Sequence, residues 1–321
     1  MANLLKEICS STDLSIQDVI KGLNKAPLEY KVYTIPKRTK GERVIAQPSP
    51  FVKKVQRAVI SVFLSKYNPS EVSTAYVEGK SIVDNAEAHK DNDWILKLDF
   101  NNFFPSLKPN DLFLFLEGEG EVIGEFDKKI LSSYLFRRNN RKLELSIGAP
   151  SSPLVSNLVM KSIDSKLEKY CNDNGVVYTR YADDLTFSTM DFDKIDELKK
   201  YITILLSETK NPKLSINESK TRVIGRGRSR RVTGIVLTHE DKLSVGRYTR
   251  KKIRAMVHHY YNKTIKKSDI PYLHGIISHM MSVEPDYYKK LEEKYGSEFF
   301  IKLAKDSYKI AKAIKQKNLV K

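Results

Sequence analysis

The stretch VVYTRYADDLTFST, from Val176 to Thr189, decides the fold expected of this chain. The β-branched and aromatic residues on both sides of its centre are typical of two strands, so the stretch predicts a β-hairpin. Asp183 and Asp184 lie next to each other at its turn, although Asp is depleted in strands. Two adjacent carboxylates in a half-buried turn repel each other by roughly 4 kcal/mol at about 4 Å and an effective dielectric near 20. Something close to the turn is therefore expected to compensate this repulsion.

The segments around this hairpin alternate between strands and helices. WILKLDF (94–100) predicts a strand, and 151–175 predicts a long helix that Ser151 caps and Gly175 ends. After the hairpin, 191–209 predicts a second amphipathic helix, and the short stretches LSIN and TRVIG predict strands. Strand, helix, hairpin, helix and strand is the order of a ferredoxin-like sheet with its helices on one face. Further on, RRVTGIVLT and DKLSVG predict another hairpin.

Positive charge dominates the composition. The 321 residues hold 56 Lys and Arg against 39 Asp and Glu, a net charge of +17. This excess indicates a polyanionic partner, for which nucleic acid is favoured over a membrane surface, because no apolar run approaches the about 18 residues of a membrane span. No signal peptide is recognised at the start, and the two cysteines, Cys9 and Cys171, have no metal-ligand spacing. A cytoplasmic protein is therefore expected.

The charge is concentrated in the last quarter of the chain. Residues 241–321 contain 19 Lys and Arg against 8 Asp and Glu, and so carry +11 of the +17. Helical periodicity in 245–267, 270–283 and 299–316 predicts a separate basic helical unit. A charged helix face is often only solvated, but its cations and tyrosines also suit RNA phosphates and unstacked bases.

A third aspartate gives the first two a chemical meaning. Asp99 ends the apolar strand of WILKLDF, and in a ferredoxin-like sheet that strand end can lie beside the turn at Asp183 and Asp184. Three carboxylates in one place need cations, and a pair of Mg²⁺ ions about 4 Å apart can clamp the attacking and leaving oxygens of a phosphoryl transfer. Taken singly, the doublet could merely shape a turn and Asp99 could cap a helix. Together, in a basic chain, they favour a metal site.

Five motifs in register resemble those of reverse transcriptases, and more narrowly of bacterial retron reverse transcriptases. YTRYADDLTFS is similar to the central aspartate-pair hairpin, LKLDFNNFFPSL to the first palm motif, and GAPSSPLVSNLVM to the motif that ends in the helix beneath the templating base pair. DNAEAH resembles the retron Asn-Ala-x-x-His element, and RRVTGIVL the retron Val-Thr-Gly motif. The resemblance spans roughly Tyr30 to Leu237.

The resemblance implies a role for each matching position at the catalytic centre. Asp99 and Asp183 would hold two Mg²⁺ ions with help from Asp184, and Phe100 belongs to the same metal-binding motif. Lys37 and Arg43 would grip the triphosphate of the incoming dNTP, although the KRTKGER stretch with Arg38 and Lys40 is also typical of a solvated hairpin tip. Phe104 matches the steric gate that excludes a 2′-hydroxyl, and Phe103 or Phe104 could also be core. The remaining matches are Gly148 and Ala149, where the backbone would approach the nucleotide, and Lys220, near the phosphates.

Other positions are expected to bind nucleic acid. They are Asn85 and His89 of DNAEAH, Arg228, Arg230 and Arg231 of the basic run 220–231, and Arg250, Lys251 and Arg254 of the last quarter. For His89, RNA contact and a purely structural role stay equally open. One departure concerns the Gln that usually precedes GAPSSP, because Ile147 stands there; we expect altered nucleotide handling with activity retained.

These observations predict an α+β right-hand polymerase with fingers, a ferredoxin-like palm and a helical thumb. The expected domains are N-terminal helices and fingers over 1–92, a palm over 93–237 with a finger insertion at about 108–147, and a basic thumb over 238–321. The expected activity is RNA-directed DNA synthesis.

The retron resemblance further implies a cognate non-coding RNA, a branched RNA-linked single-stranded DNA product, an anti-phage role and a separate effector protein. Two alternatives stay open: a group II intron-like or diversity-generating reverse transcriptase, and a catalytically idle RNA-binding scaffold for an effector. No membrane partner is expected.

Overall fold

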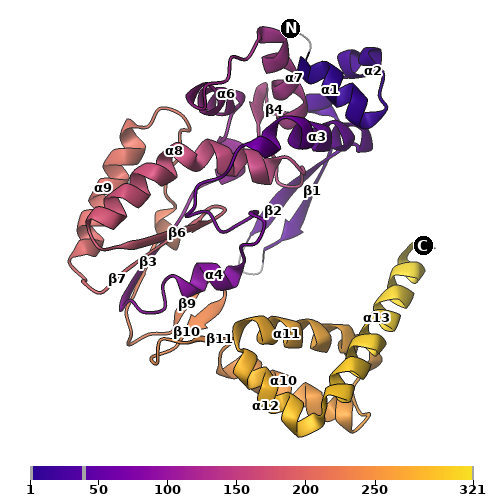
Figure 1. Ribbon diagram of the computed structural model, residues 1–321, viewed down its shortest axis with the longest axis vertical. Helices are drawn as coiled ribbons and strands as arrows, with labels where there is room; N and C mark the ends of the chain where they lie inside the picture. The colour runs from indigo at the N-terminus through magenta and orange to yellow at the C-terminus, as the bar shows by residue number, and fades with distance from the viewer. Residues whose placement is uncertain (1–2, 38–40, 320–321) are drawn as a thin grey trace. The chain divides into compact units, whose positions relative to one another are not determined.

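The computed structural model describes residues 3–37 and 41–319 (Figure 1). Arg38 and Lys40 of the KRTKGER stretch lie outside the described residues. Contacts divide the chain into two compact units, one of Met1–Ser81 and Asp93–Val223, and the other of Ile82–Asn92 and Ile224–Lys321. Each unit has its own hydrophobic core.

The first unit combines helices and strands from both ends of its sequence range. Its elements are α1 (Asn3–Thr12), α2 (Ile16–Gly22), η1 (Ala26–Leu28), β1 (Tyr30–Pro36), β2 (Glu42–Pro48), α3 (Pro50–Val62), η2 (Leu64–Lys66), β3 (Trp94–Asp99), α5 (Phe103–Ser106), α6 (Pro109–Gly118), α7 (Glu125–Leu135), β4 (Arg137–Asn139), β5 (Lys142–Glu144), α8 (Ser152–Asp173), β6 (Val177–Tyr181), β7 (Asp184–Thr189), α9 (Lys194–Glu208) and η3 (Glu218–Lys220), with β8 (Arg222–Ile224) at its end.

A four-stranded sheet of order β6-β7-β3-β8 forms the centre of the first unit. β3 and β6 each pair antiparallel with β7, and α8 and α9 lie together over the sheet (Figure 1). With β3, α8, β6–β7, α9 and β8 in chain order, this arrangement confirms the predicted ferredoxin-like topology. β3 and β7 are the inner strands and are largely buried, and their buried side chains include Leu96, Leu185 and Phe187.

The helix that precedes the hairpin begins and ends close to its predicted limits. Ser151 occupies the N-cap position of α8, but its hydroxyl makes no capping hydrogen bond, so its predicted capping role is wrong. Gly175 follows the helix with a positive φ of 63°, which glycine adopts without strain. Tyr170 of α8 stacks on Tyr201 of α9 at 3.8 Å between ring centroids, which joins the two helices.

The remainder of the first unit packs helices around a solvent-facing hairpin. α3 packs against α1 and α7, and Gln56 of α3 donates a 2.7 Å hydrogen bond to the Tyr134 carbonyl. The β1–β2 hairpin is largely exposed, and β2 contacts the loop before α8, since the Ala46 amide donates to the Ile147 carbonyl at 2.8 Å.

The second unit is a small sheet with a group of helices. Its elements are α4 (Ile82–Glu87), β9 (Arg230–Val232), β10 (Ile235–Leu237), β11 (Leu243–Ser244), α10 (Arg247–Tyr261), η4 (Lys267–Asp269), α11 (Ile270–Val283), α12 (Pro285–Tyr295) and α13 (Ser297–Leu319). β10 pairs with both β9 and β11, and α11 packs against α10, α12 and α13. The helices bury an apolar stripe that includes Val257, Leu273, Ile277 and Leu303.

Two details differ from the sequence expectations. RRVTGIVLT, predicted as one strand, folds back on itself at Thr233 and Gly234, which both have positive φ, and only its second half pairs with β11. LSIN forms no strand beyond a single bridge between Ile216 and Phe100.

The compact units also do not follow the predicted domain limits of 92/93 and 237/238. Residues 1–81 share a unit with the palm sheet, while 82–92 and 224–237 group with the C-terminal helices. The assignment of the domains as fingers, palm and thumb with those limits stays a prediction. No helix among the described residues is long and apolar enough to cross a membrane.

Candidate active site

The hairpin turn and the end of β3 bring three aspartates together. Tyr181 pairs with Asp184, so Ala182 and Asp183 form the turn between β6 and β7. Asp184 in turn lies opposite Asp99 in the β3–β7 register, and the Phe100 amide donates to the Asp183 carbonyl at 3.2 Å. Residues directly opposite in an antiparallel pair have Cα atoms about 4.5–5.5 Å apart. The predicted convergence of Asp99 with the turn is therefore confirmed.

The turn has a constrained backbone. Ala182 has a φ of 57°, in the left-handed region that residues with a side chain rarely adopt, and its side chain is 5% exposed. Ala182 directly precedes Asp183, whose carbonyl accepts from the Phe100 amide at the end of the sheet where Asp99 lies.

Burial and mutual repulsion shift the titration of the two turn aspartates. Burial, followed by the charge of Asp183 and of Asp99, raises the pKa of Asp184 to about 6, against the opposing effect of Lys97. Burial and the Asp99 charge also raise the pKa of Asp183, which Lys220 and Arg43 partly offset. Both carboxylates are thus destabilised in their ionised form and would gain from a bound cation.

Lys220 supplies a positive charge at Asp99. Its ammonium donates to both carboxylate oxygens of Asp99, at 2.8 and 2.9 Å. The Asn217 amide donates to the Asp99 carbonyl at 2.7 Å and fixes the start of η3 against β3. The Asp99 side chain is 12% exposed, whereas that of Lys220 is 55% exposed.

The donor set fits a hard divalent cation, although the side chains do not form a ready-made cage. Within residues 3–37 and 41–319, no three or more His, Cys, Asp and Glu side chains have the arrangement of a metal site. Carboxylate oxygens are the ligands that Mg²⁺ prefers, and two of the three acids are held together against their repulsion. The phenyl ring of Phe100 has no donor atom for a metal and stacks on Phe103 in the core, so only its backbone carbonyl could be a ligand.

Only some of the residues predicted to contact the nucleotide are exposed. Phe103 is buried, whereas Phe104 is half-buried and packs edge-on against it at 5.3 Å between ring centroids. Of the two rings, Phe104 is therefore the one available for the predicted steric gate. Ala149 is buried.

Gly148 has a reason to be glycine that the sequence did not reveal. Its φ is 117°, and an added Cβ would lie 3.1 Å from the Ala46 carbonyl oxygen and from Ile45 Cγ2. The close approach of the backbone at Gly148 is therefore to β2, and its predicted approach to the nucleotide is not needed to explain the glycine.

The β1–β2 hairpin carries the two predicted triphosphate ligands. Arg43 pairs with Ile35 across the hairpin, and its charge acts on Asp183 and Tyr76. The Lys37 amide donates to the Gly41 carbonyl at 2.9 Å, and its side chain is exposed.

Tyr76 belongs to this neighbourhood and was not predicted. It has a φ of 60° and is 53% exposed. Burial of its phenol group, and then the charge of Asp183, raise the pKa of Tyr76, while Arg43 opposes the shift. The stretch STAYVEGK contains no pattern that marks Tyr76, since its place depends on the path of the 70–76 loop.

Comparison with known proteins agrees with this geometry. The profile of the family described as reverse transcriptase (RNA-dependent DNA polymerase) matches residues 35–273. The retron Ec83 reverse transcriptase of Escherichia coli is 40% identical over 271 residues, which cover 83% of this chain and 87% of that protein. This chain belongs to the bacterial retron reverse transcriptases. The retron Ec86 reverse transcriptase of Escherichia coli is 34% identical over 304 residues, or 92% of this chain and 91% of that protein.

Solved structures are more distant. A telomerase from Candida albicans in complex with a TWJ fragment of telomeric RNA aligns with a TM-score of 0.49 and 12% identity. The alignment covers 88% of this chain and 60% of the telomerase chain.

As a retron reverse transcriptase, the chain is an RNA-directed DNA polymerase with the right-hand polymerase fold.

Three residues of this reverse transcriptase that were named as candidate nucleic-acid contacts have buried side chains. Asn85 and His89 are completely buried, and burial lowers the pKa of His89 to about 3, so its imidazole is neutral. Arg230 is 1% exposed and donates to the Thr238 carbonyl at 2.7 Å and to the Asn92 carbonyl. Buried side chains cannot reach RNA without local opening, so burial favours the structural alternative for His89, and Arg230 contacts the backbone of its own unit.

Asn85 and Thr233 show how the two retron motifs meet. Within the second unit the Asn85 amide reaches the Thr233 hydroxyl at 3.5 Å, and that hydroxyl donates to the Ile82 carbonyl at 3.1 Å. The two motifs thus form one structural connection between α4 and the β9–β10 turn. Arg228 and Arg231 remain exposed.

Three arginines of α10 in the retron reverse transcriptase lie at one surface cavity of the second unit. Arg247, Arg250, Arg254 and Tyr287 line a surface cavity of about 190 Å³. Arg250 is ion-paired with the buried Glu284 through a 2.7 Å hydrogen bond and lies over the Tyr287 ring at 5.1 Å. Lys251 and Arg254 are exposed. Arg247 was not among the predicted nucleic-acid contacts, and the predicted contact Arg250 is paired with Glu284.

Proposed function

We propose that this reverse transcriptase copies a structured non-coding RNA encoded beside it into a branched, RNA-linked single-stranded DNA. Synthesis would begin from a 2′-hydroxyl of a guanosine in that RNA. The proposal is supported by the identity to two retron reverse transcriptases over more than four fifths of the chain. The observation that carries it is the meeting of Asp99, Asp183 and Asp184 at one end of the sheet.

The proposed roles at the catalytic centre follow from this geometry. Asp99, Asp183 and Asp184 would hold two Mg²⁺ ions, with Phe100 contributing its carbonyl. When bound, the ions would stabilise charge on the attacking hydroxyl and on the leaving pyrophosphate of the dNTP. Arg43, whose charge already reaches the turn, would bind the triphosphate with Lys37. Phe104 would exclude a ribose 2′-hydroxyl by its volume.

Lys220 would change partner during binding. In the structure its ammonium neutralises Asp99. Once a cation takes that place, the exposed lysine side chain would turn to the phosphates of the dNTP, where a flexible point charge suits several positions.

We further propose that the exposed cations of α10, with Arg228 and Arg231, bind backbone phosphates of the cognate RNA. The product would serve anti-phage defence in the cytoplasm together with a separate effector protein. A scaffold without catalysis would not require three mutually repelling acids at one point, which is why the enzymatic proposal is favoured.

The experiment compares nucleic acid made in cells that contain the co-encoded RNA. Wild-type protein should yield a DNA that remains attached to RNA until a 2′,5′-debranching enzyme releases it. Asp183→Asn with Asp184→Asn should yield no DNA, while Asp173→Asn, an exposed acid at the end of α8, should match wild type. DNA that is unaffected by debranching, or that persists in the double variant, would contradict the proposal.

A further inference from the structure

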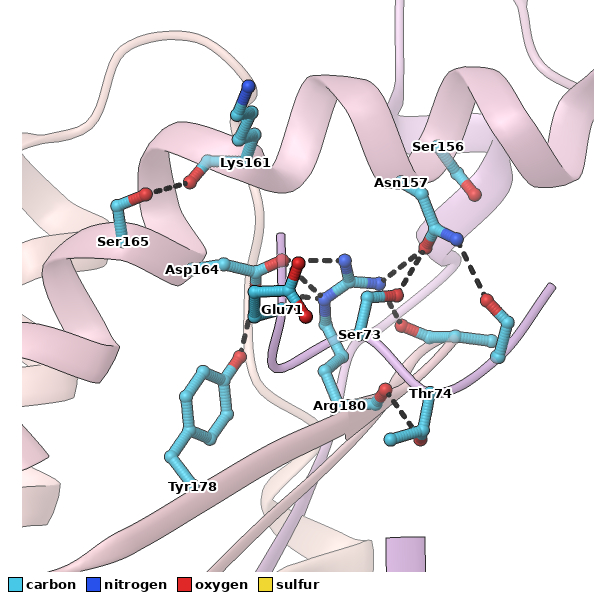
Figure 2. A network of polar contacts seen from close by, with 12 residues as sticks. Glu71, Ser73, Thr74, Ser156, Asn157, Lys161, Asp164, Ser165, Tyr178 and Arg180 are labelled. Atoms are coloured by element: carbon cyan, nitrogen blue, oxygen red, sulfur yellow. Dashed lines mark hydrogen bonds and ion pairs between the residues drawn. The ribbon is translucent and has the colours of Figure 1, made fainter. Parts of the chain in front are cut away.

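A completely buried ion pair lies next to the turn formed by Ala182 and Asp183. The side chains of Arg180 on β6 and Asp164 on α8 are 0% exposed. The guanidinium donates to both Asp164 oxygens, at 2.6 Å from Nη2 and at 2.9 and 3.1 Å from Nε (Figure 2). The Tyr178 hydroxyl adds a third donor at 2.9 Å. Every strong acceptor position of Asp164 is thus used, and the pair is well matched in geometry.

The remaining nitrogen of Arg180 reaches the catalytic turn. Nη1 donates at 3.1 Å to the carbonyl of Ala182, the left-handed residue that precedes Asp183. The same nitrogen donates at 3.1 Å to Asn157 Oδ1. The carbonyl orientation of a strained residue is therefore fixed by a side chain that α8 holds in place.

The same network fixes the loop that leads to Tyr76. Asn157 Nδ2 donates to the Ala75 carbonyl at 2.8 Å, and the Ser73 hydroxyl donates to Asn157 Oδ1 at 3.0 Å (Figure 2). The Arg180 carbonyl accepts from the amide and hydroxyl of Thr74, at 2.9 and 3.1 Å. Tyr76 is the last residue of this 72–76 loop, and the charge of Asp183 contributes to the raised pKa of its phenol.

The location of the network is not explained by stability alone. Replacing a buried ion pair by apolar side chains of similar volume is often neutral or stabilising, so buried charges are weak evidence for a role in stability. α8 already buries Leu158, Val159 and Ile163 in the core. The polar groups are instead concentrated where the turn and the 72–76 loop meet.

We propose that Arg180 is a positioning residue, which, held by Asp164 and Asn157, locks the Ala182–Asp183 turn and the 72–76 loop into one rigid body. This body sets Asp183 beside the end of β3, where the Phe100 amide donates to its carbonyl, and orders the loop that ends at Tyr76. The inference rests on the proposed catalytic role of Asp183. Arg180 itself touches neither metal nor substrate.

The test removes the polar network while retaining its volume. The triple variant Arg180→Met, Asp164→Val and Tyr178→Phe leaves no buried charge without its partner. Asn157 Oδ1 keeps the Ser73 hydroxyl as a donor, and the Ala182 carbonyl loses the donor whose role is tested. Its unfolding midpoint should stay near that of wild type, while kcat for dNTP incorporation on a primed RNA template falls about tenfold to a hundredfold and KM for dNTP changes little. Amide hydrogen exchange of the metal-free chain should accelerate about tenfold in peptides covering 72–76 and 181–184.

Two further variants make the result decisive. Arg137→Met with Glu144→Leu removes another ion pair of low exposure, in the β4–β5 hairpin, and should leave both readouts unchanged. If the triple variant does not fold, the conservative Arg180→Lys is measured in the same way, because a single ammonium cannot serve Asp164, Asn157 and Ala182 together. Wild-type kcat and wild-type protection of 181–184 in the folded variant would overturn the proposal.

The Asp183→Asn variant, assayed in parallel, separates the proposed catalytic site from the proposed positioning role of Arg180. An active Asp183→Asn variant would refute the proposed site. An inactive Asp183→Asn variant beside a fully active network variant would refute only the positioning role.

Discussion

Asp184 lies opposite Asp99 in the sheet and next to Asp183 in the chain, so its carboxylate meets two like charges where water is largely excluded. The charge of Lys97 lowers the pKa of Asp184, and the charge of Lys220 lowers that of Asp183, which offsets part of this repulsion. Such unbalanced charge is expected to destabilise the folded protein, and bound cations are expected to remove this destabilisation.

This cost predicts that Asp184→Asn stabilises the metal-free protein. The folded pKa of about 6 lies above the ordinary 3.8, so ionised Asp184 opposes folding at neutral pH, and the penalty fades as the pH falls through 6 toward 4. With chelator present, we expect Asp184→Asn to raise the free energy of unfolding by about 3 kcal/mol at pH 7.5. Chemical denaturation of the variant and of wild type measures this difference in the free energy of unfolding.

The gain should shrink by more than half at pH 4.5, where wild-type Asp184 is largely protonated in the folded state. Asp173→Asn, which changes an exposed acid, should shift the free energy of unfolding little at either pH. A gain that is independent of pH would contradict the assignment of the penalty to Asp184 ionisation.

Sequence reasoning identified residues whose chemistry shows in the chain and missed residues whose role comes from three-dimensional position. Asp99 and the turn aspartates could be predicted because acids at the ends of apolar strands are rare. Arg180 was not identified, since nothing in a strand sequence says that an arginine points inward to an aspartate on a helix. Asn85 and Arg230 were expected to bind RNA, and for His89 a structural role stayed equally open, because burial of polar side chains is invisible in a single sequence.

At the scale of elements, the loop before α8 is fixed between the sheet and the β1–β2 hairpin. Its Ile147 carbonyl accepts from β2, and Gly148 provides the backbone conformation that this contact needs. Although Ile147 replaces the family's usual glutamine, its backbone still joins the loop to β2. This loop therefore connects the element that carries Arg43 to the start of α8.

Gly148→Ala should therefore disturb both the fold and substrate binding. The positive φ and the 3.1 Å approach of a new Cβ to a backbone oxygen predict a loss of about 1–3 kcal/mol in the free energy of unfolding. KM for dNTP should rise, because β2 carries Arg43. Gly118→Ala in α6, where nothing lies within 4 Å of the added Cβ, is the control and should be neutral or slightly stabilising. Equal effects of the two changes would contradict this view of the loop.

Element types were predictable where periodicity was strong, as in α8, α9, α11 and the β6–β7 hairpin. Prediction failed where a backbone conformation decides, as at Thr233 and Gly234, whose positive φ values split an apparent strand into a hairpin. It also failed for LSIN, because a single bridge to Phe100 does not make a strand. Local composition cannot report such tertiary choices.

At the scale of the whole molecule, the excess of positive charge would attract the proposed cognate RNA at long range. The last 81 residues carry most of it, and α10 presents Arg247, Lys251 and Arg254 to solvent. Counterion release from RNA makes such binding strongly dependent on salt. The unit limits found by contacts could not be predicted, because residues 82–92 join the C-terminal helices across a long gap in sequence.

Reversing the charge of Arg247, Lys251 and Arg254 to Glu should weaken binding of the cognate RNA and lower the slope of log affinity against log salt by about 3. Arg250 is left intact because its loss would strand the buried Glu284. Titration of labelled RNA at several salt concentrations measures both quantities. Reversal of Lys302, Lys305 and Lys309 on α13 changes the net charge equally and should weaken binding less. Equal losses would show that total charge, and not α10, governs binding.

The most direct measurement of the central claim is metal binding by the purified protein. Mn²⁺, titrated with a dNTP and followed by its paramagnetic signal, should bind wild type, and binding should be lost in Asp99→Asn, Asp183→Asn and Asp184→Asn variants that remain folded. Asp173→Asn should bind as wild type does. Undiminished Mn²⁺ binding in the Asp99 and Asp183 variants would contradict the account, because the acids that meet at the end of the sheet would then not be the ligands.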